Sequence, residues 1–239
     1  MSNSIIDLSG KVVVITGGTG IQGPEHAKLF NKSGATVVVT DLKDTEIILD
    51  VTDQESIKIA TDKVIQKHGK IDILVNNAGA TGKQAADWDK IIKVNLTGTH
   101  LCCEIIGQKI TSGGSIINIS SIYGLLAPDF SIYEGAEYAG KAMGIPPGYV
   151  ASKGGVISLT KYYAALYSNR KIRVNCITPG GIYDQQADSF VKKYSIKTIL
   201  GRMANKDEVS GAVLYLASDL SSYVTGANFV VDGGLTALA

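Results

Sequence analysis

The sequence predicts a single α/β domain built on a doubly wound parallel sheet of seven strands with helices on both faces. Its length of 239 residues fits one large domain better than two small ones. Short β-branched runs alternate with longer segments of helical composition. These short runs are apolar throughout rather than alternating, as expected of strands that helices bury on both faces. No repeat or linker marks a second domain, so residues 1–239 are expected to fold as one unit.

The elements follow in a regular order along the chain. The predicted strands are residues 11–16, 35–40, 46–51, 71–77, 114–121, 172–179 and 228–234. The predicted helices are residues 22–33, 53–68, 86–111, 150–169 and 206–218. Only "LKDT", residues 42–45, separates the second and third strands. Because a crossover helix needs more residues, a plain loop is expected there.

Composition and charge argue against several classes of partner. With 23 basic and 22 acidic side chains the formal charge is +1, and no block of like charges suggests a nucleic-acid surface. The three cysteines lack metal-type or disulfide-framework spacing, which fits a reducing compartment. His26, His68 and His100 lack ligand spacing, so no metal site is expected. No targeting or transmembrane segment is evident, and a cytoplasmic protein acting on small molecules is expected.

The first candidate site is a glycine-rich loop that follows the first strand. In a doubly wound sheet, ligands bind at the carboxyl ends of the strands near the point where strand order reverses. The segment "VVVITGGTGIQG" leads from a strand into a helix, where bare backbone can approach a pyrophosphate at the helix N-terminus. The expected contacts of this Rossmann-type loop are Gly17, Thr19, Gly20, Ile21 and Gln22. A glycine-rich turn without a ligand is the alternative.

The second candidate is Asp41, which follows the next predicted strand in "VVVTDL". A carboxylate at this position can accept hydrogen bonds from the adenosine ribose hydroxyls and repels a 2′-phosphate. Lys43 is the only cation nearby. The sequence therefore predicts NAD rather than NADP as cofactor, with a loop or helix-capping role for Asp41 as the alternative.

The third candidate is the pair Tyr149 and Lys153 in "PPGYVASKGG". Positions i and i+4 share a face in any helix, and Tyr167 and Lys171 have the same spacing. Flanking sequence separates the two pairs, because Tyr149 follows a predicted strand and begins a helix, whereas Tyr167 lies near the end of that helix. Tyr149 is therefore the catalytic candidate.

Five further segments occur in a fixed order over nearly the whole chain. They are "NNAG" (76–79), "VNLTG" (94–98), "NISS" (118–121), "YVASK" (149–153) and "NCITPGG" (175–181). In these motifs the chain resembles the short-chain dehydrogenase/reductase family. Its glycine motif, with Gly20 in the middle and Ile21 after it, is closer to that of sugar-modifying members than to the commonest family form.

The resemblance implies a catalytic set of four residues. Tyr149 would exchange a proton with the substrate oxygen while a hydride moves to or from nicotinamide. Because an unperturbed tyrosine has a pKa of about 10, Lys153 would supply the charge that ionises it and also hold the nicotinamide ribose. Ser121 would hydrogen-bond the substrate oxygen, and Asn95 would position a water for proton relay. A strand-end turn role for Ser121 and a helix-bending role for Asn95 remain the alternatives.

The resemblance also implies further cofactor contacts. They are Asp50 and Val51 at the adenine edge, Asn77, Ala78 and Gly79 behind the adenosine ribose, and Pro179, Gly180 and Ile182 near the carboxamide. Asp184 replaces the threonine that is usual late in the last of these loops. The C-terminal "GANFVVDGG" resembles the family strand that packs against a second copy, which implies a homotetramer or homodimer.

Substrate specificity is expected in residues 126–147, an extra segment between Ser121 and Tyr149. Its polar side chains suit a polyhydroxylated or charged substrate better than a fatty chain, since hydroxyl recognition needs placed polar partners. They are Tyr133, Tyr138, Glu134, Glu137 and Lys141. A surface loop or an oligomer contact is the alternative. Residues 183–199 follow the "PGG" loop and are expected to form a lid with residues 126–147.

Two stretches, "ISSIYGLLAPDFSIYEG" (119–135) and "RVNCITPGGIYDQQADSF" (173–190), also resemble flagellin-modification and surface-polysaccharide oxidoreductases of this family, which are linked to sugar and nonulosonic-acid pathways. The sequence therefore favours an NAD-dependent enzyme that interconverts a secondary alcohol and a ketone on a sugar or a sugar-nucleotide-like substrate. A 3-ketoacyl thioester or other small ketone is the alternative substrate. A non-catalytic NAD-binding sensor or scaffold is the alternative function.

Overall fold

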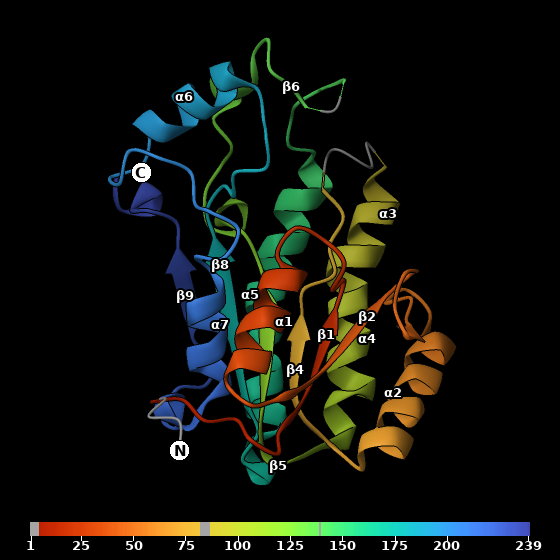
Figure 1. Ribbon diagram of the computed structural model, residues 1–239. Helices are drawn as coiled ribbons and strands as arrows, with labels where there is room; N and C mark the ends of the chain where they lie inside the picture. Colours follow the sequence, from red (N-terminus) through yellow and green to blue (C-terminus); the bar gives the residue numbers. More distant parts are fainter. Residues whose placement is uncertain (1–4, 82–86, 139) are drawn as a thin grey trace.

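A computed structural model describes residues 5–81, 87–138 and 140–239 of the chain. Its seven-stranded sheet is entirely parallel and has the order β3-β2-β1-β4-β5-β8-β9 (Figure 1). The strands are β1 (Val12–Thr16), β2 (Thr36–Asp41), β3 (Ile47–Ile48), β4 (Ile71–Asn76), β5 (Ile110–Ile119), β8 (Arg173–Pro179) and β9 (Asn228–Val231). The predicted fold class is confirmed.

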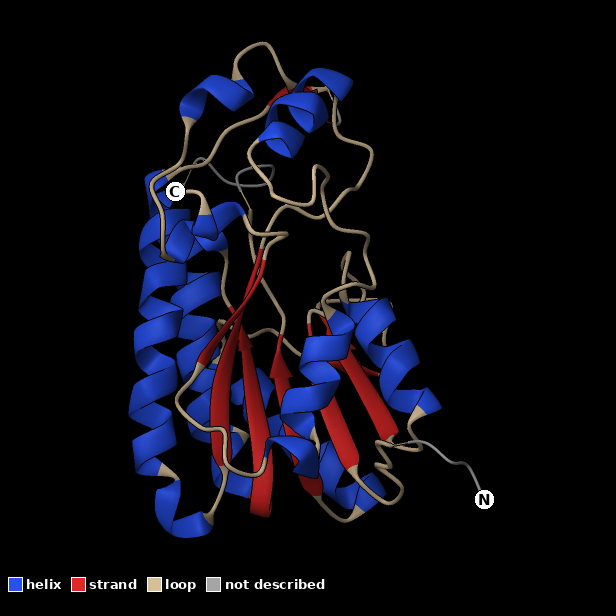
Figure 2. Cartoon of the chain, turned by 90° about the vertical axis from the view of Figure 1, so that its left-hand side faces the viewer, coloured by secondary structure: helices blue, strands red, loops and turns tan. Residues whose placement is uncertain are grey.

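Helices cover both faces of the sheet, and each face has its own apolar core (Figures 1 and 2). One core joins the sheet to α2 (Gln54–His68), α4 (Gly98–Ile105) and α5 (Pro147–Leu166). The other joins it to α1 (Gly23–Lys32) and α7 (Ser210–Ala217). Alternate residues of β1 divide between the two cores, with Val12 and Val14 in one and Val13 and Ile15 in the other. This division explains why the strand is apolar at every position.

Local signals fix two of the helix boundaries. Asp53 caps α2, since its carboxylate accepts a hydrogen bond from the Glu55 N–H at 2.9 Å. Gly69 ends the same helix with a φ of +80°. Helix α5 begins at Pro147, because proline suits the first turn of a helix. The helix therefore starts three residues before its predicted start at residue 150, and Tyr149 lies inside its first turn.

The predicted helix 86–111 is wrong as one continuous element. It is divided into α3 (Trp88–Ile92), a π-helical turn (Lys93–Thr97), α4 and a 3₁₀ turn (Gly107–Lys109). Residue 86 lies outside the described residues. Strand β5 already begins at Ile110, four residues before its predicted start. Side-chain bonds from Asn95 to Ala80 hold the π-helical turn against the loop after β4, a long-range contact that a local pattern does not reveal.

Smaller differences concern the ends of three other elements. The predicted strand 46–51 is reduced to β3, because the Asp50 carboxylate turns the chain by accepting a hydrogen bond from the Thr52 N–H at 2.8 Å. The predicted loop at residues 42–45 is confirmed. Strand β9 ends at Val231 rather than at residue 234, and α7 covers only residues 210–217 of the predicted helix 206–218.

Strand order reverses between β1 and β4, and the carboxyl ends of both strands lie on the side of a small cap (Figure 2). The cap is formed by a 3₁₀ turn (Phe130–Tyr133), the hairpin β6 (Glu137–Tyr138) and β7 (Lys141–Ala142), and α6 (Asp188–Ile196). It comes from the two segments predicted to form the substrate loop and the lid. In the described ranges, no helix is both long and apolar enough to cross a membrane.

Candidate active site

The glycine-rich loop and the loop after β4 meet at the point where strand order reverses. The Thr16 hydroxyl accepts hydrogen bonds from the N–H groups of Asn77 and Ala78, each at 3.2 Å. The Asn77 side chain donates to the Gly17 carbonyl at 2.7 Å. Gly17 has a φ of +62°, and a Cβ there would lie 2.5 Å from the Cα of Ala78. Only glycine allows these two loops to approach so closely.

The loop fits the phosphates of a dinucleotide. No side chain caps the N-terminus of α1, so the positive end of the helix dipole is directed at the loop. The Gln22 amide nitrogen, at the cap position, is buried and has no partner among the described residues. Gly20 and Ile21 are exposed beside it. A bound phosphate would supply the acceptor that these donors lack.

Asp41 stands at the end of β2, next to the glycine-rich loop. One carboxylate oxygen accepts hydrogen bonds from the Thr19 N–H at 3.0 Å and from the Thr19 hydroxyl at 2.6 Å. The other accepts from the Leu42 N–H at 2.8 Å. The structure thus brings two predicted cofactor residues, Thr19 and Asp41, into direct contact, and Asp41 offers the acceptor atoms that ribose hydroxyls require.

The remaining predicted cofactor residues surround the same strand ends. Asp50 is half-buried, and the side chain of Val51 packs against Gly98 of α4. A Cβ on Gly79 would lie 3.6 Å from the Asn95 side-chain oxygen and 3.8 Å from Lys153 Nζ. The segment from Pro179 to Ile182 follows β8, where the Gly180 N–H donates to Val231 at 2.9 Å and Ile182 pairs with Ala204.

Ser121, Tyr149 and Lys153 converge where β5 ends and α5 begins. The Ser121 hydroxyl accepts a hydrogen bond from the Tyr123 N–H at 3.3 Å and caps the turn Ile122–Gly124. Lys153 donates to the Ile119 carbonyl at 2.8 Å, and its Nζ lies 5.7 Å from the centre of the Tyr149 ring. The predicted catalytic tyrosine and lysine therefore share both a helix face and a neighbouring strand end.

Burial shifts both ionisable groups of this trio toward their neutral forms. Desolvation raises the pKa of Tyr149, and the Ser121 hydroxyl acts in the opposite direction. Desolvation also lowers the pKa of Lys153 to about 8. At neutral pH Lys153 is therefore positively charged, although burial of this charge destabilises the folded protein, and Tyr149 is protonated.

Asn95 is fully engaged by the protein. Its side chain accepts from the Ala80 N–H at 2.7 Å and donates to the Ala80 carbonyl at 2.9 Å and to Ser152 at 3.2 Å. Its own carbonyl accepts from the Thr99 hydroxyl at 2.8 Å. Asn95 thus links the loop after β4 to α5 one residue from Lys153. This supports the helix-bending alternative, and a role in water positioning stays a prediction.

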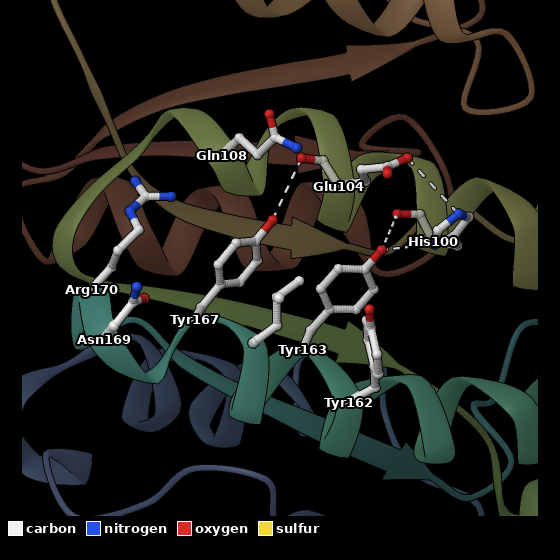
Figure 3. A pocket seen from close by; sticks show the side chains of 9 residues that line it. His100, Glu104, Gln108, Tyr162, Tyr163, Tyr167, Asn169 and Arg170 are labelled. Atoms are coloured by element: carbon white, nitrogen blue, oxygen red, sulfur yellow. Dashed lines mark hydrogen bonds and ion pairs between the residues drawn. The ribbon is translucent and has the colours of Figure 1, made fainter.

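The second tyrosine–lysine pair has different surroundings. Tyr167 lies at the far end of α5 from Tyr149, is 5% exposed, and donates its hydroxyl to the Cys103 carbonyl at 2.8 Å. It lines a cavity of about 340 Å³ between α4 and α5, shown in Figure 3. Lys171 lies beyond the helix with a φ of +55°. The two tyrosine–lysine pairs therefore have the same spacing in the sequence but lie at opposite ends of α5, as the flanking sequence predicts.

The two predicted mobile segments pack against each other. Tyr133 of the first contacts Phe190 of the second, with ring centres 5.2 Å apart. Lys193 donates to the Ser131 carbonyl at 2.9 Å, and Lys197 pairs with Asp129 at 2.5 Å. The segments predicted to be the substrate loop and the lid therefore form one cap over the strand ends.

The polar side chains predicted for substrate recognition are divided within this cap. Glu134, Glu137 and Lys141 are exposed, whereas Tyr133 is buried in the cluster with Phe190. Tyr138 hydrogen-bonds to Asp184, which also pairs with Lys206 at 2.7 Å. The aspartate that replaces the family threonine thus joins the substrate loop to the lid.

One residue of the site was not predicted. Tyr123 follows Ser121 by two positions, and its hydroxyl lies 2.5 Å from the hydroxyl of Tyr133. The sequence signal was its proximity to Ser121 on the turn that leaves β5.

The described residues contain no group of three side chains able to hold a metal ion. His26, next to the glycine-rich loop, is buried and contacts the Ser210 hydroxyl through Nδ1 at 2.8 Å. Burial lowers the pKa of His26 to about 4, so the ring is neutral at physiological pH.

Comparisons with known proteins agree with this geometry. Residues 19–236 match the family model described as enoyl-(acyl carrier protein) reductase. The 3-oxoacyl-acyl-carrier-protein reductase FabG of Thermotoga maritima is 35% identical, covering 95% of this chain and 98% of that protein. The D-threitol dehydrogenase of Mycolicibacterium smegmatis is 31% identical, covering 96% and 94%.

A solved structure shows the same architecture. The short-chain dehydrogenase of Leptospira borgpetersenii serovar Hardjo-bovis, solved with bound NAD+, is 33% identical and superposes with a TM-score of 0.85, covering 96% of this chain and 94% of that one. The family match and these relatives each span more than nine-tenths of the sequence. The chain belongs to the short-chain dehydrogenase/reductase family.

Proposed function

We propose that this protein is an NAD-dependent oxidoreductase that interconverts a secondary alcohol and a ketone. The observation that carries the proposal is the convergence of Ser121, Tyr149 and Lys153 beside a glycine-rich loop that fits a dinucleotide. Family membership and the 3-oxoacyl reductase and D-threitol dehydrogenase relatives support the same reaction class.

Each residue receives a role from its position. Gly17, Gly20 and the N-terminus of α1 would hold the pyrophosphate, and Asp41 would bind the adenosine ribose. When bound, the nicotinamide ring supplies or accepts the hydride. Tyr149 gives or takes the proton of the substrate oxygen, and Ser121 donates a hydrogen bond to that oxygen.

The protonation states of Tyr149 and Lys153 determine whether a given pH favours ketone reduction or alcohol oxidation. Tyr149 is protonated at neutral pH because burial raises its pKa, so it is ready to donate a proton during ketone reduction. Alcohol oxidation needs the phenolate, which the charge of Lys153 stabilises. We expect oxidation to accelerate, relative to reduction, as pH rises toward the pKa of Lys153 at about 8.

For the substrate we propose a polyhydroxylated, sugar-like molecule, with surface-glycan or nonulosonic-acid metabolism as its setting. The support is the group of phenol hydroxyls from Tyr123 and Tyr133 near the reacting centre. The D-threitol dehydrogenase relative acts, by its name, on a polyol. The exposed charges of the cap add nothing to this argument.

A second candidate substrate is a 3-ketoacyl thioester. It is favoured by the relative named 3-oxoacyl-acyl-carrier-protein reductase, which matches 95% of the chain. A reactive ketone two carbons from a carbonyl would use the same Ser121 and Tyr149. The two candidates differ only in what the cap must accommodate.

A turnover screen tests these proposals. Purified protein is assayed with NAD(H) and NADP(H) against sugars, nucleotide sugars, polyols and 3-ketoacyl thioesters, with the variant Tyr149→Phe as the control for chemistry. Turnover of a polyol or sugar that Tyr149→Phe abolishes is the expected result. Faster turnover of thioesters supports the second candidate. Tight NAD binding with no turnover of any class supports a sensor or scaffold instead.

Three accompanying proposals concern the whole molecule. We propose that residues 126–147 and 183–199 close together over the site, since they already share one apolar cluster. A cytoplasmic setting is consistent with three cysteines that are free and buried. A homodimer or homotetramer, inferred from the resemblance of the C-terminal strand, is tested by light scattering.

A further inference from the structure

Two tyrosines that have no part in the proposed chemistry meet next to it. Tyr123 lies on the turn Ile122–Gly124, and Tyr133 on the turn Phe130–Tyr133 of the cap. Their hydroxyl oxygens are 2.5 Å apart. The pair therefore joins the end of β5 to the predicted substrate loop.

The turn that carries Tyr123 is held against the catalytic helix. A Cβ on Gly124 would lie 2.8 Å from the carbonyl carbon and oxygen of Lys153, so only glycine permits this approach. The Tyr123 N–H donates to the Ser121 hydroxyl at 3.3 Å. Burial raises the pKa of both Tyr123 and Tyr133, and the nearby Tyr149 phenol adds a smaller rise to each, which places the two phenols within electrostatic reach of the reacting group.

The rings of Tyr123 and Tyr133 differ in how firmly the protein holds them. Tyr133 is 8% exposed and its ring is fixed by Phe190, with ring centres 5.2 Å apart. Tyr123 is more exposed and only packs against the edge of the same cluster. Tyr133 is thus the rigid member and Tyr123 is the one that a ligand can reach.

A count of donors shows which proton is available. Two phenols carry two O–H donors, and the bond between them uses one. If Tyr123 donated, the proton of Tyr133 would be buried without an acceptor in the described structure, which is a costly arrangement. Tyr133 is therefore the donor, and its pKa is accordingly raised by this bond. The O–H of Tyr123 then has no acceptor among the residues that the structure describes.

We infer that Tyr123 is a specificity-determining residue that donates a hydrogen bond to a substrate oxygen close to the reacting carbon, with Tyr133 fixing its orientation. This inference rests on the proposed function and refines its substrate class. Vicinal diols and hydroxyketones carry such an oxygen on the next carbon, and a 3-ketoacyl thioester carries one two carbons away. A simple alcohol or ketone carries none.

Matched substrates isolate this hydrogen bond. The oxidation rate with NAD+ is measured for three substrates: cyclohexane-1,2-diol, cyclohexane-1,3-diol and cyclohexanol. The proteins compared are the wild type, Tyr123→Phe, Tyr133→Phe and the double variant. Tyr167→Phe, which also loses a buried hydroxyl but lies at the far end of α5, is the control. Thermal unfolding establishes that each variant is folded.

We expect Tyr123→Phe to lower kcat/KM about tenfold for one of the two diols and less than about twofold for cyclohexanol. Tyr133→Phe should raise KM for the same diol by a smaller factor, with little change in kcat. Because Tyr133 acts through Tyr123, the double variant should be no worse than Tyr123→Phe alone. The diol that responds identifies the position of the substrate oxygen.

Two failures are distinguishable. A wild type that oxidises cyclohexanol but shows no preference for either diol overturns the inference and the sugar-like substrate together, leaving the oxidoreductase proposal standing. A wild type that prefers a diol, with the same preference in Tyr123→Phe, overturns only the inference. If turnover is too slow to compare, binding of the diols and of cyclohexanol to the NADH-loaded protein, followed by cofactor fluorescence, gives the same comparison. Equal changes in affinity for all three compounds on Tyr123→Phe would then overturn it.

Discussion

Replacing Lys153 by methionine should destroy activity and stabilise the protein at neutral pH. The ammonium group is buried, and its only hydrogen-bond acceptor in the described structure is the Ile119 carbonyl at 2.8 Å. Burial lowers the pKa of Lys153 from 10.5 to about 8. At about 1.4 kcal/mol per pKa unit, keeping this cation in the folded protein costs about 3 kcal/mol.

The net gain is smaller than this cost. Methionine has a similar shape but leaves the Ile119 carbonyl without its donor, a loss of about 1 kcal/mol. We therefore expect Lys153→Met to raise the free energy of unfolding by about 2 kcal/mol at pH 7. For a chain of this size the melting temperature should rise by about 4–8 °C.

The advantage of the variant should depend on pH in a defined direction. Below pH 8, Lys153 is charged in both the folded and the unfolded chain, so the full cost is present. Between pH 8 and 10.5 the unfolded chain binds more protons than the folded one, and the stability of the wild type rises with pH. The difference between the two proteins should therefore fall to near zero by about pH 10.

Urea unfolding of the cofactor-free proteins from pH 7 to 10 measures this difference. Lys161→Met, which removes an exposed lysine of the same helix, should change stability by less than about 0.5 kcal/mol throughout. A variant less stable than the wild type at pH 7, or a difference that is constant with pH, would refute the reasoning. The expected result identifies Lys153 as a residue retained for chemistry at the expense of stability.

Three further outcomes follow from the site. NAD(H) should bind at least about tenfold more tightly than NADP(H), because Asp41 repels a 2′-phosphate; comparable dissociation constants would contradict this. Tyr149→Phe should lower kcat by about a hundredfold or more at nearly unchanged NAD affinity, whereas Tyr167→Phe should leave kcat unchanged and cost about 1 kcal/mol of stability. Hydrogen exchange of the backbone amides in residues 126–147 and 183–199 should slow in both segments together when NAD and substrate are present. Shortening residues 126–147 to a short loop should preserve NAD binding while reducing turnover.

Elements encoded by neighbouring residues could be predicted from the sequence. The start and end of α2 follow from Asp53 and Gly69, whose capping roles depend only on residues next to them in the chain. The glycine-rich loop was predictable for a similar reason, since Gly17 is required by a local turn between a strand and a helix.

Elements that depend on distant contacts could not be predicted in this way. The π-helical turn inside the predicted helix 86–111 is tied by Asn95 to Ala80, a residue in another loop. The sequence offered a bend at Asn95 only as an alternative, and the residue in the other loop that holds the bend cannot be read from the helical pattern. The same bonds place Asn95 behind the predicted catalytic residues, in line with the helix-bending alternative that the sequence left open beside water positioning.

The orientation of the side chains in the predicted substrate segment was even less predictable from the sequence. Charge and hydroxyl content selected residues 126–147 for recognition, yet the charged members Glu134 and Glu137 are exposed. The orientation of Tyr133 is set by Phe190, from a segment that follows β8, and by Tyr123, from the turn that follows β5. A side chain can be chosen for its chemistry from the sequence, but whether it turns toward a substrate depends on which partner holds it. For this chain that partner is a phenol beside Ser121, and the donor left free by their hydrogen bond is what we expect to select the substrate.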